Sequence, residues 1–275
     1  MNAESLAAQM GAEVSLLSPF GIQLEFSGSS GVTLANIPTE ELKSLLAHHR
    51  LILMRGLNPI TEQPEFAAQC RRWGELLEWD FGAVFEVVEH ADPQNYLFTS
   101  GSVPYHWDGA FAAQVPWLQI FQCCEAPATP AGGETIFCNT PALWNALPHE
   151  TRVQWETVEI AYTTEKVAHY GGAIRVPLVQ THPLTGETML RFAEPANATT
   201  VSLNTPQLEV HGISPEQVPA FLAELIHHIY DPQWVFSHAW QAGDYLIADN
   251  HALLHGRTRY DQQSPRRLWR AHVLT

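Results

Sequence analysis

Short apolar runs, separated by Pro, Gly and Asn residues, recur along most of the chain. Runs of this kind are typical of β-strands, and many of them without a regular alternation of strand and helix favour an antiparallel sandwich or barrel. The runs predict strands at Arg50–Arg55, Trp117–Cys123, Thr135–Cys138, Val158–Tyr162, Met189–Phe192, Tyr245–Ala248 and Leu268–Val273. The chain is therefore predicted to be mostly β.

Helical spacing of apolar residues occurs between some of these runs. The spacing predicts helices at Pro38–His49, Gln63–Gly74, Pro141–Leu147 and Ser214–Tyr230. In the first, Leu42, Leu45 and Leu46 form an apolar stripe, and the last opens with Ser-Pro-Glu-Gln, a capping sequence with Pro at the first helical position. We expect these helices to flank the strands from outside. No shift in composition marks a boundary, so residues 1–275 are predicted to form a single domain.

Composition and charge exclude some classes of function. The chain has 275 residues, is 45% hydrophobic and carries a formal net charge of −15. This hydrophobic content is sufficient for a packed core. Binding to nucleic acid or to an anionic membrane needs clustered Lys and Arg side chains. The chain has only 14 Lys and Arg residues, and one cluster of them, Arg266, Arg267 and Arg270, lies close to the C-terminal end. With a net charge of −15, neither nucleic acid nor an anionic membrane is expected as a partner.

The cysteines and the N-terminal segment bear on localisation. Cys70, Cys123, Cys124 and Cys138 form no CxxC pair and no zinc-ribbon spacing. The first residues, MNAESLAAQMGAEV, lack the basic and apolar parts of a secretion signal, and no apolar run is long enough to span a membrane. We therefore expect a soluble, cytoplasmic protein with reduced thiols.

A pattern that suits a metal ion lies in the stretch VPYHWDGAF, residues 103–111. His106 and Asp108 are two positions apart, and residues i and i+2 of an extended segment point to the same side. One metal ion could then accept both side chains. Taken alone, His106 is better explained as a structural histidine, so a third ligand decides the interpretation.

The best candidate for the third ligand is His255, in the stretch GDYLIADNHALLHGR. His251 and His255 are four positions apart and could be mistaken for a helical zinc pair, but they follow a predicted strand and no Glu follows His251. Two His and one carboxylate form the facial triad of a non-haem Fe(II) centre. Such a centre leaves coordination positions open for a cosubstrate and for O2.

Two arginines follow His255 at a spacing that suits a carboxylate ligand. Arg266, Leu268 and Arg270 occupy alternate positions of the last predicted strand, so both guanidinium groups are expected on one face. A guanidinium binds a carboxylate through two parallel hydrogen bonds, and the distal carboxylate of 2-oxoglutarate suits this place. A hydroxyl at Thr135, where the stretch GGET enters a strand, could donate another hydrogen bond to the same carboxylate.

Together these motifs resemble the taurine-dioxygenase-like Fe(II)/2-oxoglutarate oxygenases, over nearly the whole chain. The motifs are HxD at 106–108, GGET at 132–135, DNHALLHGR at 249–257 and RxLxR at 266–270. The resemblance implies a double-stranded β-helix, also called a jelly roll or cupin-like fold, with flanking helices. It implies that the iron ligands are His106, Asp108 and His255, and that Thr135 and Arg266 hold 2-oxoglutarate.

A closer resemblance is to the PvcB/IsnB-type enzymes of isonitrile biosynthesis. It is carried by FGAVFEVVEH (81–90), VPYHWDG (103–109), LRFAEPA (190–196), IYDPQWVFSHAW (229–240) and IADNHALLHGR (247–257). Such enzymes act on the α-isocyano acid made from an amino acid, usually tyrosine. They oxidise its Cα–Cβ bond, and many also remove the carboxylate to leave an aryl vinyl isonitrile. The resemblance implies Fe(II), 2-oxoglutarate and O2 as cofactors and a small isocyano acid as the substrate.

The chemistry of such an acid indicates which residues would bind it. Its carboxylate needs a cation, and Arg270, which lies near the metal in this family, is the first candidate, with His272 the second. Arg270 could instead brace the carboxylate of the metal site. The aromatic ring needs an apolar wall, for which Trp107, Phe81 and Tyr105 are the candidates.

Several alternatives stay open at this point. Another small acid, such as the tryptophan-derived isonitrile or a taurine-like sulfonate, could be hydroxylated or desaturated without loss of CO2. A non-catalytic jelly-roll binding protein and a zinc hydrolase that uses the same triad are the other classes. Among the remaining histidines, His182 is interpreted as a loop or surface group. A homo-oligomer is compatible with the resemblance.

Overall fold

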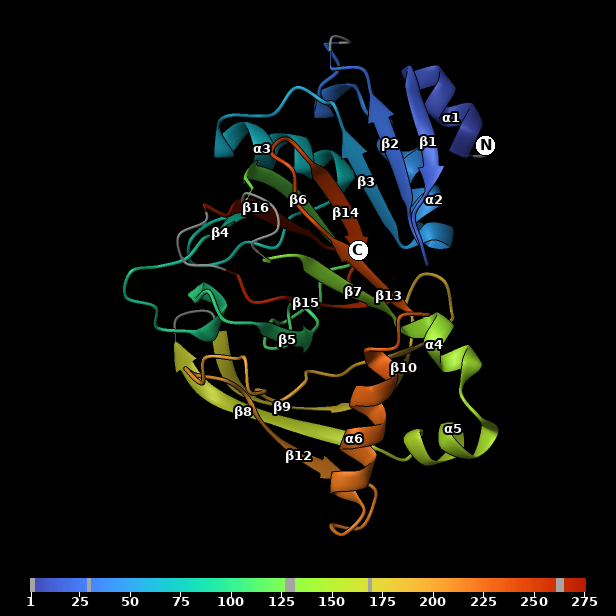
Figure 1. Ribbon diagram of the computed structural model, residues 1–275, viewed down its shortest axis with the longest axis vertical. Coiled ribbons are helices and arrows are strands. Elements are labelled where there is room, and N and C mark those ends of the chain that lie inside the picture. The colour runs from blue at the N-terminus through green and yellow to red at the C-terminus, as the bar shows by residue number, and fades with distance from the viewer. Residues whose placement is uncertain (1–2, 29–30, 127–131, 168–169, 261–264) are drawn as a thin grey trace.

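The computed structural model describes residues 3–28, 31–126, 132–167, 170–260 and 265–275. In these residues the largest sheet has the strand order β1-β2-β3-β14-β6-β16-β4 (Figure 1). The strand bounds are β1 Ala12–Leu16, β2 Ile22–Phe26, β3 Leu51–Arg55, β4 Val84–Val87, β6 Leu118–Glu125, β14 Tyr245–Asp249 and β16 Arg267–Val273. Neighbouring strands are antiparallel except for β2 and β3, which are parallel.

A second sheet faces the first and completes a sandwich. Its strands, in the order β13-β7-β15-β5, are β13 Val235–His238, β7 Thr135–Asn139, β15 Leu253–Arg257 and β5 Val103–His106. The two sheets share one apolar core, in which Phe121 and Leu246 of the larger sheet lie with Phe137 and Leu253 of the smaller. The chain passes from β6 to β7 and from β14 to β15, so consecutive strands lie in opposite sheets. This is the predicted jelly roll.

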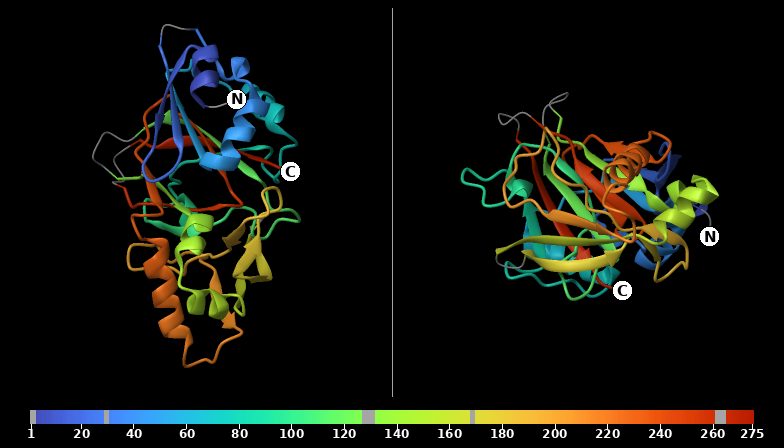
Figure 2. Two further views of the ribbon diagram at one scale, coloured as in Figure 1. Left: turned by 90° about the vertical axis from the view of Figure 1, so that its right-hand side faces the viewer. Right: turned by 90° about the horizontal axis from the view of Figure 1, so that it is seen from below.

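A third layer covers the outer face of the smaller sheet (Figures 1 and 2). Its elements are β8 Glu159–Val167, β9 Tyr170–Pro177, β10 Val179–Thr181, β11 Thr188–Leu190, β12 Gln207–His211, α4 Thr140–Ala146, α5 His149–Trp155 and α6 Val218–Ile229. Tyr105 of β5 and Leu254 of β15 pack here in one core with Tyr162 and Phe221. Because side chains alternate along a strand, the next residues of β5 and β15 point into the jelly roll.

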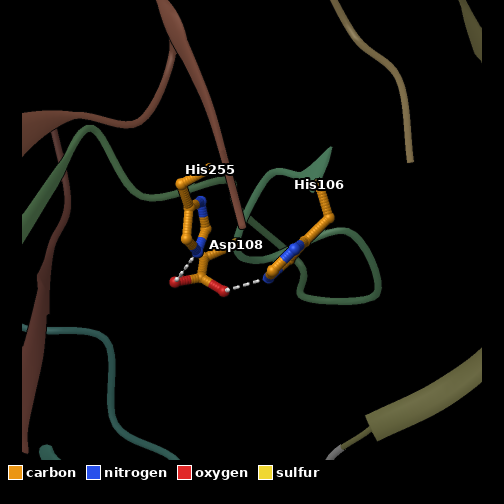
Figure 3. A group of neighbouring side chains, drawn as sticks. All are labelled: His106, Asp108 and His255. Atoms are coloured by element: carbon orange, nitrogen blue, oxygen red, sulfur yellow. Dashed lines mark ion pairs between the residues drawn. The ribbon is translucent and has the colours of Figure 1, made fainter. Parts of the chain in front are cut away.

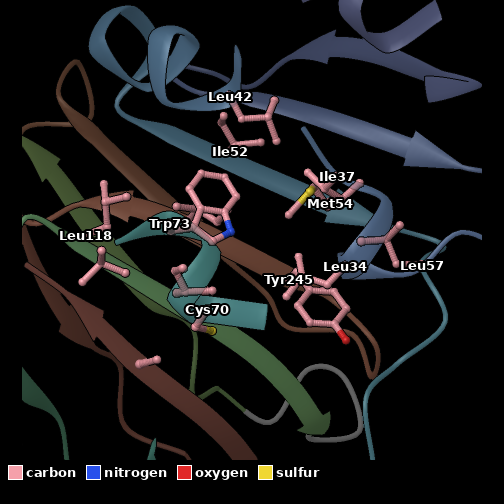
Figure 4. Close-up of a cluster of buried hydrophobic side chains, with 14 of the residues drawn as sticks. Leu34, Ile37, Leu42, Ile52, Met54, Leu57, Cys70, Trp73, Leu118 and Tyr245 are labelled. Carbon is pink, nitrogen blue, oxygen red and sulfur yellow. The ribbon is translucent and has the colours of Figure 1, made fainter. Parts of the chain in front are cut away.

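Helices also cover the outer face of the larger sheet. They are α1 Ala3–Met10, α2 Thr39–His49, α3 Gln63–Cys70 and the short 3-10 helices η1 Leu34–Asn36 and η2 Arg71–Trp73, while η3 Tyr96–Phe98 precedes β5. Figure 4 shows part of the core between them, where Leu42 and Trp73 lie close to Ile52 and other residues of the sheet. Within the described ranges, none of the helices has the length and apolar character needed to cross a membrane.

Most predicted helices and strands are present, but some of their ends differ. Helix α6 begins at Val218 rather than at Ser214, because the intervening residues form a turn in which the Gln217 N–H donates to the Ser214 carbonyl. The helix predicted over Gln63–Gly74 is α-helical only to Cys70 and continues as η2. Strand β9 lacks a clear apolar alternation in the sequence and was not predicted, and β12 was missed although its residues QLEVH do alternate.

Candidate metal centre

Two neighbouring strands bring the candidate metal ligands together. His106 of β5 and His255 of β15 are register partners, and Asp108 follows just beyond the end of β5. One possible ligand atom from each side chain lies within 4.8 Å of the other two (Figure 3). The strand pairing therefore brings residues from distant parts of the sequence to one point.

Hydrogen bonds and a glycine fix the turn that carries Asp108. The Asn250 side chain accepts from the Asp108 N–H at 2.9 Å and donates to the Asp108 carbonyl at 3.1 Å. Gly109 has a φ of +82°, and a Cβ at this position would lie 2.4 Å from Cδ of Pro116. Because a side chain would not fit there, glycine allows the chain to turn directly after Asp108.

His255 is buried and His106 is partly buried, and both are held as neutral imidazoles. Nδ1–H of His106 donates to the Pro104 carbonyl at 2.9 Å, which leaves the Nε2 lone pair facing Oδ1 of Asp108 at 3.7 Å. Burial lowers the pKa of His106, and burial together with the neighbouring His106 ring lowers the pKa of His255 well below its usual range. The neutral imidazole is the form that binds a metal ion.

The Asp108 carboxylate is ionised, and the protein engages one of its oxygens. Oδ2 accepts from Gln119 Nε2, from Arg270 Nη1 at 2.7 Å and from His272 Nε2 at 2.8 Å. Burial raises the pKa of this carboxyl, but Arg270 and the nearby imidazoles outweigh burial and lower the pKa well below its usual range. These groups fit Fe(II), because two neutral imidazoles and one carboxylate oxygen leave its other positions open.

A small cavity lies next to the ligands inside the jelly roll. The residues that line it include His106, His255, Thr135, Arg266 and Arg270. Arg266 is buried, and its Nε–H donates to the Gly133 carbonyl at 2.9 Å. Burial and the positive charge of Arg257 lower the pKa of Arg266 to about 9, so its guanidinium stays charged at neutral pH. The cavity thus joins a buried cation to the metal ligands, which suits an anionic chelator.

The hydroxyl of Thr135 is oriented by two donors. Oγ1 accepts from Trp240 Nε1 at 2.9 Å and from Arg266 Nη2 at 3.3 Å. A hydroxyl has two acceptor lone pairs and one proton to donate. With both lone pairs engaged, the proton points elsewhere, and Thr135 lines the small cavity. The hydroxyl is therefore suited to donate to a carboxylate in that cavity.

A second, mostly apolar cavity opens next to the same ligands. Its lining includes Trp79, Phe81, Phe85, Trp107, Phe111 and Tyr162, together with His106, Asp108, Arg270 and His272 near the metal site. Arg270 lines both cavities and packs against the rings of Phe85 and Phe121, with its Cζ 5.0 and 5.8 Å from their centroids. Aromatic walls around one cation suit an aromatic acid.

The structure brings most of the predicted substrate residues to this cavity. Those that line it are Phe81, Trp107, Arg270 and His272. Tyr105 does not line it: the side chain is fully buried on the other side of β5 and packs against Tyr230, with ring centroids 4.8 Å apart. Tyr105 directly precedes His106 in the strand, and consecutive side chains point to opposite faces.

Some residues that support the site were given no role in the sequence analysis. Gln119 and Asn250 hold Asp108, and Trp240 orients Thr135. Sequence reasoning missed all of them. Gln119 offered a signal, because it lies in the apolar run of β6 and is only 1% exposed. A polar residue in an otherwise apolar strand is expected to have a hydrogen-bond partner.

His182 was interpreted as a loop or surface group: it does lie in the loop between β10 and β11, but it is not at the surface. His182 is 1% exposed, and its Nε2 lies 2.9 Å from Oδ2 of Asp249 at the end of β14. His251, the alternative metal ligand, accepts from Arg191 Nη2 at 2.6 Å and does not join the triad. These buried polar groups fasten the segment that leads from β14 to β15, so they position His255 from a distance.

Comparison with known proteins assigns the family. The family model described as "Taurine catabolism dioxygenase TauD, TfdA family" matches residues 12–272. The chain belongs to this family. A 3-((Z)-2-isocyanoethenyl)-1H-indole synthase from Fischerella ambigua is 46% identical over 272 residues, which are 98% of this chain and 99% of the relative. A tyrosine isonitrile desaturase from Pseudomonas aeruginosa is 36% identical over 255 residues, or 92% and 87% of the two chains.

Solved structures support the assignment to this TauD/TfdA dioxygenase family. The crystal structure of PvcB from Pseudomonas aeruginosa has a TM-score of 0.81 and 32% identity, and it covers 96% of this chain and 91% of that one. PvcB is described as an Fe, α-ketoglutarate-dependent oxygenase from an isonitrile synthetic pathway. A Burkholderia xenovorans taurine dioxygenase, with a TM-score of 0.72, 22% identity and coverage of 96% and 90%, shares the fold. The protein is therefore an Fe(II)/2-oxoglutarate-dependent dioxygenase, with O2 as cosubstrate.

Proposed function

We propose that this dioxygenase converts an α-isocyano acid, derived from an aromatic amino acid, to an aryl vinyl isonitrile with loss of CO2. The observation that carries the proposal is the aromatic cavity that reaches Arg270 and the metal ligands. The relatives support the same substrate class, since one is a tyrosine isonitrile desaturase and another makes an isocyanoethenyl indole. The proposed ligands are His106, Asp108 and His255.

The reaction balances with one 2-oxoglutarate and one O2 for each substrate molecule. When bound, Fe(II) would let O2 act as the oxidant, and 2-oxoglutarate would become succinate, which keeps one oxygen atom of O2, and CO2. The substrate loses a hydrogen from Cβ, a further electron, and its carboxylate as a second CO2. The electron pair of the broken carboxylate bond remains as part of the new C=C bond. The hydrogen atom and the electron, with one proton from solvent, reduce the second oxygen atom of O2 to water. The second CO2 distinguishes this reaction from hydroxylation and from simple desaturation.

Arg266 and Thr135 are proposed to hold the distal carboxylate of 2-oxoglutarate. The guanidinium is charged and buried, and the hydroxyl has its proton free to donate. Both groups lie in the cavity that also reaches His106 and His255. A chelator bound between them would therefore be anchored at one end by hydrogen bonds and at the other by the metal.

Arg270 is proposed to hold the substrate carboxylate. Its Nη1 binds Asp108, but its Nε is buried and has no hydrogen-bond partner among the described residues. Leaving a buried donor unpaired costs about 1–3 kcal/mol, and a substrate carboxylate would offset this cost. With the acid held there, the ring would lie among aromatic side chains such as Phe81 and Trp107.

Tyrosine is the predicted source of the acid, and tryptophan is a second candidate. The relative that makes the indole product is 46% identical, against 36% for the tyrosine isonitrile desaturase of P. aeruginosa. The cavity wall next to Trp107 also consists partly of small residues, Gly109, Ala110 and Ala112. Small side chains there would leave room for a bicyclic ring.

Product analysis with isotopically labelled acids tests the proposal. Tyrosine isonitrile and tryptophan isonitrile, each labelled in the carboxyl group, are supplied separately with Fe(II), 2-oxoglutarate and O2. We expect labelled CO2 and the vinyl isonitrile in equal amounts, with one succinate for each. A product that retains the label would contradict decarboxylation. Succinate formation that depends on neither acid would contradict the substrate class, and the ratio of kcat/KM values identifies the preferred ring.

Three predictions about the whole protein follow from the same proposal. The chain is proposed to act as one oxygenase domain over residues 1–275, because the two sheets of the jelly roll share a core. It is proposed to work in the cytoplasm on a small molecule. A homo-oligomer stays a prediction, which light scattering of the purified protein checks.

A further inference from the structure

The second oxygen of Asp108 is surrounded by donors. Gln119 Nε2, Arg270 Nη1 and His272 Nε2 all approach Oδ2. The amide and the guanidinium can act there only as donors, whereas each nitrogen of a neutral imidazole can donate or accept. Whether His272 donates to Asp108 therefore depends on what its other nitrogen contacts.

Trp79 decides the role of His272. The indole Nε1–H is a donor only, and it lies 3.2 Å from Nδ1 of His272. Nδ1 therefore accepts, and Nε2 carries the proton that is donated to Asp108 at 2.8 Å. His272 is 2% exposed, and its ring stands edge-on to Trp79, with centroids 5.6 Å apart and planes at 73°. The geometry thus selects one tautomer of His272.

Trp79 is also part of the aromatic wall of the larger cavity. It stacks on Phe81 with centroids 6.2 Å apart and planes at 19°, and both rings line the cavity. A backbone hydrogen bond also joins the segments that carry Trp79 and His272: the Leu77 N–H donates to the His272 carbonyl at 2.9 Å. The side chain that orients His272 would therefore lie next to the bound substrate ring.

We propose that Trp79 and His272 form a positioning pair, which holds Oδ2 of Asp108 and so presents Oδ1 to the iron. The inference rests on the proposed assignment of His106, Asp108 and His255 as ligands. In this role His272 acts through Asp108 and not on the substrate carboxylate. A hydrogen bond to the second oxygen of a ligating carboxylate fixes its orientation and tunes the metal.

The affinity for Fe(II) tests the pair without any turnover. It is measured by anaerobic titration of the purified protein, together with the visible charge-transfer band of the Fe(II)–2-oxoglutarate complex. His272→Leu removes the donor, and the loss of such a partner weakens metal binding about 10–100-fold. His272→Gln supplies an N–H at a similar distance and should restore most of the affinity. Trp79→Phe keeps an aromatic ring but removes the indole N–H. It should weaken Fe(II) binding less than His272→Leu does and shift the charge-transfer band in the same direction as that variant.

Phe81→Leu is the matched control, because Phe81 stacks on Trp79 in the same wall but is outside the proposed pair. Its Fe(II) affinity should equal that of the parent. Parent-like affinity in His272→Leu, or equal losses in His272→Leu and His272→Gln, would overturn the pair. His255→Ala separates this failure from a wrong ligand assignment, since parent-like Fe(II) binding there would refute the triad itself. Circular dichroism checks the fold, and the Gln and Phe variants decide the outcome if His272→Leu does not fold.

Discussion

The two cavities share His106 and Arg270 but are built from different material. The smaller is lined mainly by residues of the strands β4, β5, β6, β7, β15 and β16 and by Arg266 just before β16, and beside apolar side chains it presents charged groups and the Thr135 hydroxyl. The larger is walled by apolar side chains, many from segments between strands, such as Phe111 and Pro206. Strands of a packed core hold side chains firmly, whereas loops tolerate changes in shape and composition. On the proposed function, the first cavity binds one fixed cosubstrate and the second selects the ring.

Arg257 connects the two regions. This buried residue of β15, two positions after His255, donates from Nη1 to the Leu97 carbonyl at 3.1 Å and from Nη2 to the carbonyls of Thr99 and Gly101. Leu97 lines both cavities. One part of the loop wall is therefore fastened to the strand that carries His255.

The largest effect should come from disabling the proposed metal site, which lies next to both cavities. His255→Ala takes away one of the proposed ligands, so we expect loss of Fe(II) binding and of turnover with every substrate. Anaerobic Fe(II) titration and succinate formation measure both. His251→Ala is the matched control, because His251 contacts Arg191 and is outside the triad. Activity retained in His255→Ala would show that the centre has been misassigned.

Arg266→Ala should damage the smaller cavity alone. Removing one partner of a buried, hydrogen-bonded charge pair costs about 2–5 kcal/mol, so the Kd for 2-oxoglutarate should rise on the order of 100-fold or more. Titration of the charge-transfer band gives this Kd directly. Arg267→Ala is the control, because Arg267 is adjacent in sequence but pairs outside with Glu125 at 2.7 Å. An unchanged Kd in Arg266→Ala would move the cosubstrate site elsewhere.

A smaller effect in the same cavity is expected from Trp240→Phe. This change keeps an aromatic ring but removes the N–H that donates a hydrogen bond to the Thr135 hydroxyl oxygen. The hydroxyl proton can then turn away from the cosubstrate, and a hydrogen bond of this kind contributes about 1 kcal/mol. The Kd for 2-oxoglutarate should rise about fivefold to tenfold. Trp269→Phe, which removes another buried indole whose N–H faces Glu86 at 3.4 Å, should leave that Kd unchanged.

The two regions also differ in how far the sequence predicts them. That His106, Asp108 and His255 lie together could be predicted, because the HxD pattern needs only local alternation and a later histidine, and the family pattern selected His255. Thr135 and Arg266 were predicted from their places on strands as well as from the family pattern, and both line the small cavity. A strand keeps its side-chain alternation whatever surrounds it, so positions on strands can be inferred from spacing.

The supporting contacts could not be predicted, because their partners lie far apart in the chain. Trp79 and His272 are separated by 193 positions, and Asn250 and Asp108 by 142. No local pattern records which indole meets which imidazole. Tyr105 shows the opposite error: its aromatic character suggested the substrate wall, whereas alternation next to His106 already directs it to the other face.

The smallest effect should be confined to the aromatic wall. Phe81→Ala removes a ring that lines the larger cavity but is 43% exposed, so only part of its apolar surface can be covered by a bound ring. Full burial of a Phe side chain contributes about 1.5–3 kcal/mol, and the partial loss should raise the KM for the isonitrile about twofold to fivefold. The Kd for 2-oxoglutarate should stay at the parent value, because Phe81 does not line the smaller cavity. Steady-state kinetics with the isonitrile varied, beside the anaerobic cosubstrate titration, separates the two constants. A rise in the cosubstrate Kd with no change in the isonitrile KM would reverse the roles assigned to the cavities.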